Sequence, residues 1–135
     1  MSTHDTQNIE IEADPARVQT FIADGANLPR WAIGFAKDVE SSGEQWIVTT
    51  GSGDRIPTDI VTNAATGTVD FVMAPAPGLT TTAWTRVVAV DRGALFTFTQ
   101  VQPTGMPDDM FAAQVRALSH ELLTLKALLE VECPL

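Results

Sequence analysis

The chain of 135 residues has no tyrosine, one cysteine and only two histidines. Cys133 has no partner for a disulfide within the chain, which favours a reducing compartment. His4 lies near the start of the chain and His120 on the outer side of an expected helix, so the sequence provides neither a histidine-based metal site nor a Ser-His-Asp triad. We expect no metal and no cofactor. The lack of tyrosine removes a common proton donor and favours binding over catalysis.

Basic residues are also scarce, with eight Lys and Arg against 17 Asp and Glu and a formal net charge of −9. Nucleic acids and anionic membrane surfaces attract clustered positive charge, so neither is an expected partner. No apolar run approaches the roughly 20 residues that span a bilayer, and residues 1–8 lack the pattern of a signal peptide. We expect one cytoplasmic domain, residues 1–135. Its oligomeric state stays open and includes a dimer.

What the sequence does contain is a long amphipathic segment near its C-terminus. Between 107 and 132, apolar residues are spaced alternately four and three apart, which predicts one continuous helix with an apolar stripe. The stripe consists of Phe111, Val115, Leu118, Leu122, Leu125 and Leu129. Gln114 lies near the centre of this stripe and Glu121 at its edge. We expect Gln114 to be a polar contact from the helix, or a solvated position beside it.

Residues before this helix are mainly typical of strands. Residues 8–13 alternate between apolar and polar, Asp14 and Pro15 begin a short helix that Gly25 ends, and 27–31 predict a second helical turn broken near Pro29. Further strands are expected at 35–40, 45–50, 55–62, 68–73, 80–90 and 94–102. The helix must bury its stripe on the apolar face of the sheet. This order predicts an α+β fold, in which a curved antiparallel sheet of about six to seven strands wraps around the C-terminal helix and can enclose a cavity.

Several segments together resemble the START-like (SRPBCC) superfamily, and within it the polyketide cyclase/dehydrase and lipid-transport group. They are residues 9–24 (IEIEADPARVQTFIAD), 29–31 (PRW), 67–70 (GTVD), 86–88 (RVV) and 120–130 (HELLTLKALLE). The resemblance implies a helix-grip fold with a cavity under the long helix, and places Trp31 to close one end of that cavity. The alternative for Trp31 is that it fills the core. It does not imply one activity. Members bind lipids, hormones and polyketides, and a minority catalyse cyclisation, dehydration or hydrolysis.

In the last expected strand, Phe96, Phe98 and Gln100 share a face that we expect to point toward the helix. The two phenylalanines fit either core packing or a cavity wall. A polar Gln100 in an inward row needs a partner, which would be water, a ligand or solvent at the end of the sheet. The sequence predicts a small, largely apolar ligand. The predicted ligand-contacting residues are Trp31, Trp84, Phe96, Phe98, Gln100, Phe111, Gln114 and Leu118.

Asp70 and Arg86 each lie in the middle of an apolar strand. A turn centred on Gly78 places them opposite each other, whereas a turn nearer Ala76 places Asp70 opposite Thr82. Two interpretations stay open. The residues form an ion pair on a solvated sheet face, or they lie in the cavity of a cyclase- or dehydratase-type enzyme, with Asp70 as general base and Arg86 as electrostatic partner. A third alternative for the chain is an interaction module whose cavity is filled by its own side chains.

Overall fold

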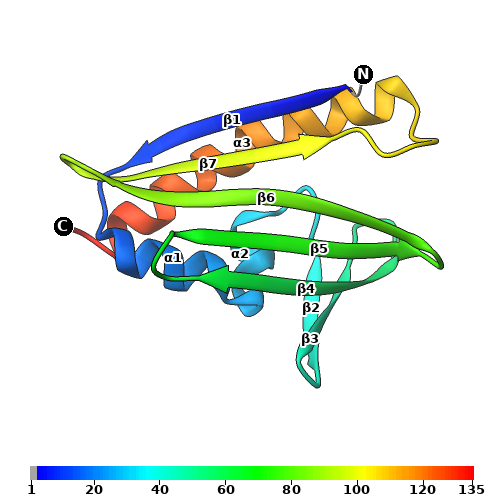
Figure 1. Cartoon of the computed structure of the whole chain (residues 1–135), viewed down its shortest axis with the longest axis horizontal. Helices are drawn as coiled ribbons and strands as arrows, with labels where there is room; N and C mark the ends of the chain where they lie inside the picture. Colours follow the sequence, from blue (N-terminus) through cyan, green and yellow to red (C-terminus); the bar gives the residue numbers. More distant parts are fainter. Residues whose placement is uncertain (1–2) are drawn as a thin grey trace.

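The computed structural model describes residues 3–135, which form a seven-stranded antiparallel sheet and three α-helices (Figure 1). The strands are β1 (His4–Ile11), β2 (Asp38–Ser42), β3 (Gln45–Thr49), β4 (Arg55–Asn63), β5 (Thr68–Ala76), β6 (Leu79–Val90) and β7 (Gly93–Val101). They pair in the order β1-β7-β6-β5-β4-β3-β2. The helices are α1 (Pro15–Ala23), α2 (Leu28–Trp31) and α3 (Asp108–Glu132), with a 3₁₀ turn, η1 (Gly25–Asn27), between the first two. The predicted curved sheet with a long C-terminal helix is confirmed.

Local sequence signals explain where the helices begin. The side chain of Asp14 accepts a hydrogen bond from the backbone N–H of Arg17 at 3.3 Å, and Pro15 occupies the first position of α1. Pro29 lies in the first turn of α2, where its missing N–H breaks no helical hydrogen bond, so the predicted break near Pro29 is wrong. Asp108 in the first turn of α3 interacts favourably with the positive end of the helix dipole.

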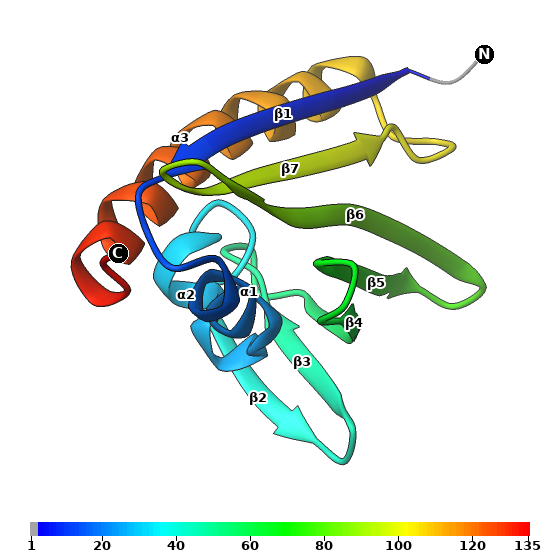
Figure 2. The ribbon, with the colours of Figure 1, turned by 60° about the vertical axis from the view of Figure 1, so that its left-hand side comes forward.

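The concave face of the sheet follows from strict alternation of side chains. In β5, Val69 and Phe71 are buried, while their neighbours point to the outer face. The same face continues across the neighbouring strands, because paired residues point to the same side of a sheet. Val87 of β6 pairs with Phe96 of β7, and Phe96 pairs with Ile9 of β1. Helix α3 lies along β1 on this concave side (Figures 1 and 2).

One end of this arrangement is closed. Ile11 of β1, Ile22 of α1, and Leu125 and Leu129 of α3 are all exposed by 1% or less. The chain end is tied to the same place, since the backbone N–H of Asp14 donates to the carbonyl of Cys133 at 2.9 Å. Together these residues form a dry core where α1 and the end of α3 meet the sheet.

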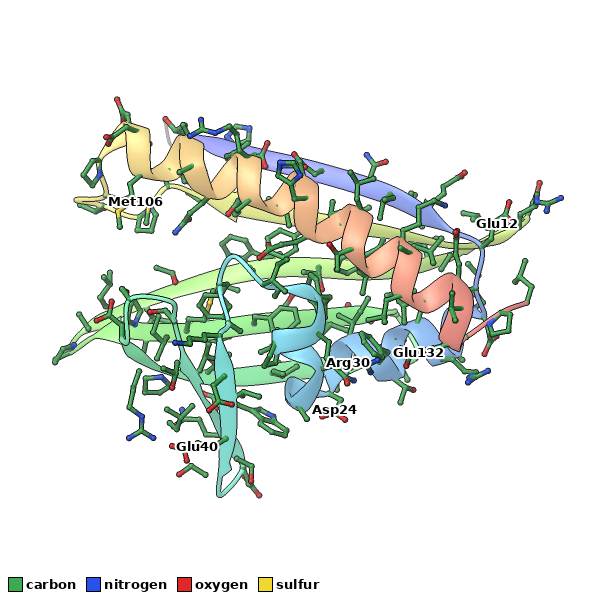
Figure 3. All side chains as sticks on the ribbon, turned by 180° about the vertical axis from the view of Figure 1, so that it is seen from behind. Glu12, Asp24, Arg30, Glu40, Met106 and Glu132 are labelled. Atoms are coloured by element: carbon green, nitrogen blue, oxygen red, sulfur yellow. The ribbon has the colours of Figure 1, made fainter. Side chains whose placement is uncertain are left out.

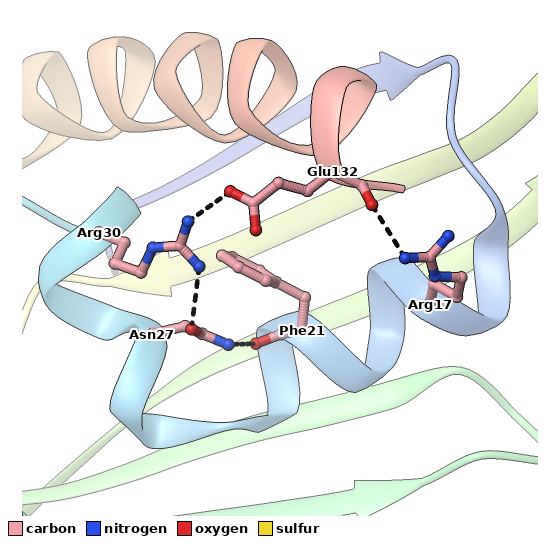
Figure 4. Close-up of polar contacts among 5 residues, drawn as sticks. All are labelled: Arg17, Phe21, Asn27, Arg30 and Glu132. Atoms are coloured by element: carbon pink, nitrogen blue, oxygen red, sulfur yellow. Dashed lines mark hydrogen bonds and ion pairs between the residues drawn. The ribbon is translucent and has the colours of Figure 1, made fainter. Parts of the chain in front are cut away.

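Polar contacts clamp the two short helices onto the end of α3 (Figure 4). Arg30 of α2 forms an ion pair with Glu132, and its guanidinium lies 5.2 Å from the ring centroid of Phe21 in α1. Arg17 of α1 donates to the backbone carbonyl of Glu132 at 2.9 Å. The side chain of Asn27 links Arg30 to the carbonyl of Phe21. The last turn of α3 is therefore held from both α1 and α2.

The β2–β3 hairpin covers the turn between α1 and α2 (Figure 2). The indole of Trp46 in β3 lies so close to Gly25 that a Cβ at that position would be only 2.5 Å from its ring. Only glycine allows this approach. The hairpin thus fixes η1, and with it the position of α2.

Candidate functional site

Trp31, the last residue of α2, lies at the centre of the space between sheet and helix. It is 1% exposed, and its ring meets Phe71 of β5 and Phe96 of β7 edge-on, with centroid distances of 6.5 and 6.1 Å. Because β6 separates β5 from β7, the indole reaches across three strands of the concave face. Trp31 therefore fills the inner part of the space in which the sequence predicted a cavity.

The indole N–H of Trp31 has an unusual environment. Its Nε1 is buried and has no hydrogen-bond partner among residues 3–135. An indole nitrogen can only donate, and a buried donor left unpaired costs about 1–3 kcal/mol. Such a group is a reason to expect an acceptor from outside the chain. The sequence predicted a role for the ring of Trp31 and gave no sign of this unpaired donor.

Glu121 of α3 is a buried carboxyl group that the sequence placed only at the edge of the apolar stripe. It is 8% exposed and accepts hydrogen bonds from the backbone N–H groups of Gly34, at 2.9 Å, and Phe35. Burial raises the pKa of Glu121 to about 7, and these hydrogen bonds partly oppose the shift. Glu121 thereby holds the segment that follows Trp31 against α3. Its distance of three residues from Leu118 and four from Leu125 was the signal for burial.

A row of polar side chains lies where the concave face meets the N-terminal half of α3. Gln7 of β1 donates from its amide to Asp5 and to the backbone carbonyl of Val115, each at 2.9 Å, and its amide oxygen accepts from Ser119 at 2.9 Å. The amide of Gln100 donates to the same Asp5 carboxylate at 3.4 Å. Gln100 therefore does have a protein partner, and Gln7 joins β1 to α3.

Beyond Trp31 the concave face is only half covered. Met73 of β5, Phe98 of β7 and Gln100 are partly buried, although their positions in the alternation point toward the helix side. Gln114 of α3 is exposed. We call these four residues the open end. It contrasts with the closed core around Leu125.

Of the helix residues predicted to contact a ligand, Phe111 and Leu118 are buried, at 5% and 2% exposure. Gln114 is not a buried contact. It lies two turns before Glu121 on nearly the same side of α3, but the segment at Gly34 that covers Glu121 does not extend as far as Gln114. Of the two alternatives for Gln114, this exposure fits the solvated position beside the stripe.

Asp70, Arg86 and Trp84 lie on the outer face of the sheet. Asp70 pairs with Trp84, which is 47% exposed, and Arg86 pairs with Thr68. The pairing of Ala76 with Leu79 would by itself place Asp70 opposite Thr85, and the register shift between Met73 and Ala76 moves its partner to Trp84. Neither predicted alternative is observed. The guanidinium of Arg86 donates to the backbone carbonyl of Thr66 at 2.8 Å.

These positions correct two predictions. A catalytic pair of Asp70 and Arg86 inside the cavity is wrong, because the buried neighbours Val69 and Phe71 take the inward positions of β5. Trp84 as a contact inside the cavity is wrong for the corresponding reason in β6, where Ala83 and Thr85 point inward. Both residues lie on the outer face, as the first interpretation expected, but they do not form its ion pair, because Asp70 lies opposite Trp84 and Arg86 opposite Thr68.

Two surface pockets lie elsewhere on the molecule. One of about 550 Å³ lies between the start of β1 and the first turns of α3, and includes Asp5 and Phe111. Another of about 870 Å³ lies between α1, the β4–β5 turn and β6, and includes Gln19 and Arg86. Neither includes Trp31. Within residues 3–135 no group of His, Cys, Asp and Glu is arranged to hold a metal ion, and no helix is long and apolar enough to cross a membrane.

Comparisons with known proteins reveal similarity in fold. No protein-family model matches the sequence, and no curated protein matches it either. Among solved structures, the XoxI protein of Bacillus cereus superposes with a TM-score of 0.75 and 20% identity over 96% of both chains. The Aha1 dimer of Colwellia psychrerythraea gives 0.75 and 18%, covering 96% of this chain and 97% of that one. The Zhui aromatase/cyclase of a Streptomyces species gives 0.73 and 14%, covering 96% and 94%.

These superpositions show a shared fold, and at such low identity they show nothing about activity. The seven-stranded curved sheet and the long C-terminal helix match these structures over nearly their whole length. The chain therefore has a helix-grip fold, as the sequence resemblance implied.

Proposed function

We propose that this protein binds a small, largely apolar molecule at the open end of the space between the concave sheet face and α3. The observation that carries this proposal is the half-buried state of Phe98 and Met73. Both point to the inside of the fold, yet the helix does not cover them fully. A ligand that covers this apolar surface stabilises the complex by about 25 cal/mol for each Å² removed from water.

The chemistry around the open end limits the ligand. Trp31 and Phe96 form an aromatic inner wall, with the Phe98 ring 6.5 Å from that of Phe96 in an edge-to-face arrangement. Gln100 provides a polar group at the rim, beside the Asp5 carboxylate. This combination favours a molecule with an aromatic or aliphatic body that enters from the Gln114 side, and it disfavours an anion.

Binding is better supported than catalysis. The Asp70 and Arg86 pair, on which the cyclase-type alternative depended, lies on the opposite face of the sheet. Glu121, which is buried, already uses its carboxyl group to accept two backbone N–H groups. One structural neighbour is an aromatase/cyclase, which agrees with a small-molecule site in this fold. This similarity of fold does not assign a reaction to this chain.

The remaining alternative is an interaction module filled by its own side chains, and one experiment separates the two. Gently purified protein is examined by native mass spectrometry and then titrated with the neutral fluorescent probe N-phenyl-1-naphthylamine. We expect one saturable site. Phe98→Ala should weaken binding at least fivefold, whereas the matched control Trp84→Ala, on the outer face, should leave the affinity unchanged. No saturable binding, or equal losses in both variants, would refute the proposal.

A further inference from the structure

Within residues 3–135, every buried polar side chain except one has a hydrogen-bond partner in the chain. Gln19 donates to the backbone carbonyl of Asn63 at 3.1 Å, and Thr58 donates to that of Ile56 at 3.1 Å. Thr85 donates to a backbone carbonyl of the neighbouring strand β5, and Glu121 accepts two backbone N–H groups. Among the described residues, the Nε1 of Trp31 is the one buried side-chain nitrogen or oxygen without a partner.

The groups that surround Trp31 explain why the chain does not satisfy this donor. Phe71 and Phe96 meet the indole with their rings, and neither side chain has a hydrogen-bond acceptor of ordinary strength. Glu121 holds the segment that follows Trp31, but its carboxyl group accepts the backbone N–H groups of Gly34 and Phe35. A buried donor in an aromatic wall favours a ligand that brings an acceptor into an apolar surrounding.

We infer that the bound molecule carries a neutral carbonyl oxygen, as in a ketone, ester or lactone, which accepts the hydrogen bond of the Trp31 indole. This inference rests on the proposed function and specifies its ligand. A carboxylate is disfavoured, because its charge would be desolvated against the aromatic rings of Phe71 and Phe96. A pure hydrocarbon would leave the donor unpaired.

Two isosteric probes test the inference: 2-acetylnaphthalene has the carbonyl, and 2-isopropenylnaphthalene has a CH₂ group in its place. The affinities of both are measured by displacement of N-phenyl-1-naphthylamine, in the wild type and in Trp31→Phe. The preference for the ketone in the wild type should fall about tenfold in Trp31→Phe, since the two probes differ only in one hydrogen-bond acceptor. Comparing ratios cancels the different solubilities of the probes.

A measurement on the wild-type protein covers the case in which Trp31→Phe does not fold. The indole N–H signals of ¹⁵N-labelled protein are assigned by comparison with Trp46→Phe and Trp84→Phe, which leave Trp31 in place. The ketone should move the Trp31 signal downfield, whereas the hydrocarbon isostere should not. Trp84, on the outer face, serves as the internal control because neither probe should move its signal.

The possible failures are distinguishable. If neither probe binds saturably, the proposed function fails and the inference falls with it. If both bind and Phe98→Ala weakens both, but the ratio of affinities is the same in Trp31→Phe and the indole signal responds equally to both, the site stands and the carbonyl inference is overturned. That result would mean that the indole donates to water in the bound protein.

Discussion

The two halves of α3 carry the same apolar spacing but have different environments. In the C-terminal half, Leu122, Leu125 and Leu129 are exposed by 3% or less. In the N-terminal half, Phe111 and Leu118 are buried and Val115 is half-buried, whereas Gln114 and Met110 are exposed, the latter by 55%. A periodic stripe therefore predicts which side of a helix faces the protein, but not how much of that side the protein covers.

The difference comes from what lies across the helix. The C-terminal half is closed by α1 and α2, and Figure 3 shows Arg30 and Glu132 at this end. The N-terminal half is held mainly from one side, through the contacts of Gln7 with Val115 and Ser119. The first arrangement favours stability and the second leaves apolar surface available to a ligand.

The largest expected loss of stability comes from a substitution in the C-terminal half of α3. Leu122→Ala should lower the free energy of unfolding by about 2–5 kcal/mol, because it leaves a cavity in a fully packed core. Val115→Ala, in the open half, should cost about 1 kcal/mol, since its side chain is only half-buried. Urea denaturation of the two variants measures both values. Equal losses would mean that the two halves are packed alike.

The stability of the protein should depend on pH through Glu121, which lies near the middle of α3. Folding raises the pKa of this residue from 4.5 to about 7, so the folded protein holds the proton more tightly than the unfolded chain. The stability contributed by the protonated carboxyl is fully present below pH 4.5 and is lost as the pH rises through about 7, in total about 3 kcal/mol.

Glu121→Gln provides the matched comparison, because other titrating groups are common to both proteins. The difference in unfolding free energy between the variant and the wild type should shift in favour of the variant as the pH rises from 5 to 8. Chemical denaturation at four pH values measures this shift. A difference that stays constant with pH would show that Glu121 is not a buried acid with a raised pKa.

A smaller loss of stability is expected when the ion pair between Arg30 and Glu132 is removed. The side chains of Arg30 and Glu132 are 44% and 38% exposed, and an ion pair of this kind contributes about 0–1 kcal/mol. Arg30→Met should therefore lower the melting temperature by only a few degrees, with less effect at high salt. A loss of stability as large as that of Leu122→Ala would show that the ion pair, and not the apolar core, holds α2 against the end of α3.

The smallest effect on stability should come from Gln114→Leu at the open end. The side chain is exposed and makes no hydrogen bond recorded among residues 3–135, so the free energy of unfolding should change by less than about 0.5 kcal/mol. The affinity for N-phenyl-1-naphthylamine should nevertheless change, because the substitution adds apolar surface beside the site. An unchanged affinity would place the ligand away from Gln114.

Much of the fold could be predicted because its signals are local. The spacing of leucines predicted α3 to within one residue of its observed start, and Asp14 with Pro15 predicted the start of α1. Alternation in β7 correctly predicted that Phe96 and Phe98 share the inward face. Each of these depends on neighbours in sequence and on the period of one element.

The site was harder to predict because its geometry depends on distant contacts. The pairing of Asp70 with Trp84 depends on the register shift near Pro75, which turn signals alone do not reveal. The exposure of Gln114 depends on how far the segment at Gly34 extends along α3. The unpaired donor of Trp31 arises only when α2 is packed against strands 40 and more residues later in the chain.

The most direct test of the proposed binding site is a ¹H–¹⁵N correlation spectrum of the protein, recorded while 2-acetylnaphthalene is added. We expect saturable shifts for the backbone amides of Met73, Phe98 and Gln114 and for the Trp31 indole, with amides of the outer face, such as Trp84 and Arg86, unchanged. Shifts confined to the outer face or to the pocket between α1 and β6, or no saturable shifts at all, would contradict a ligand site between the sheet and α3.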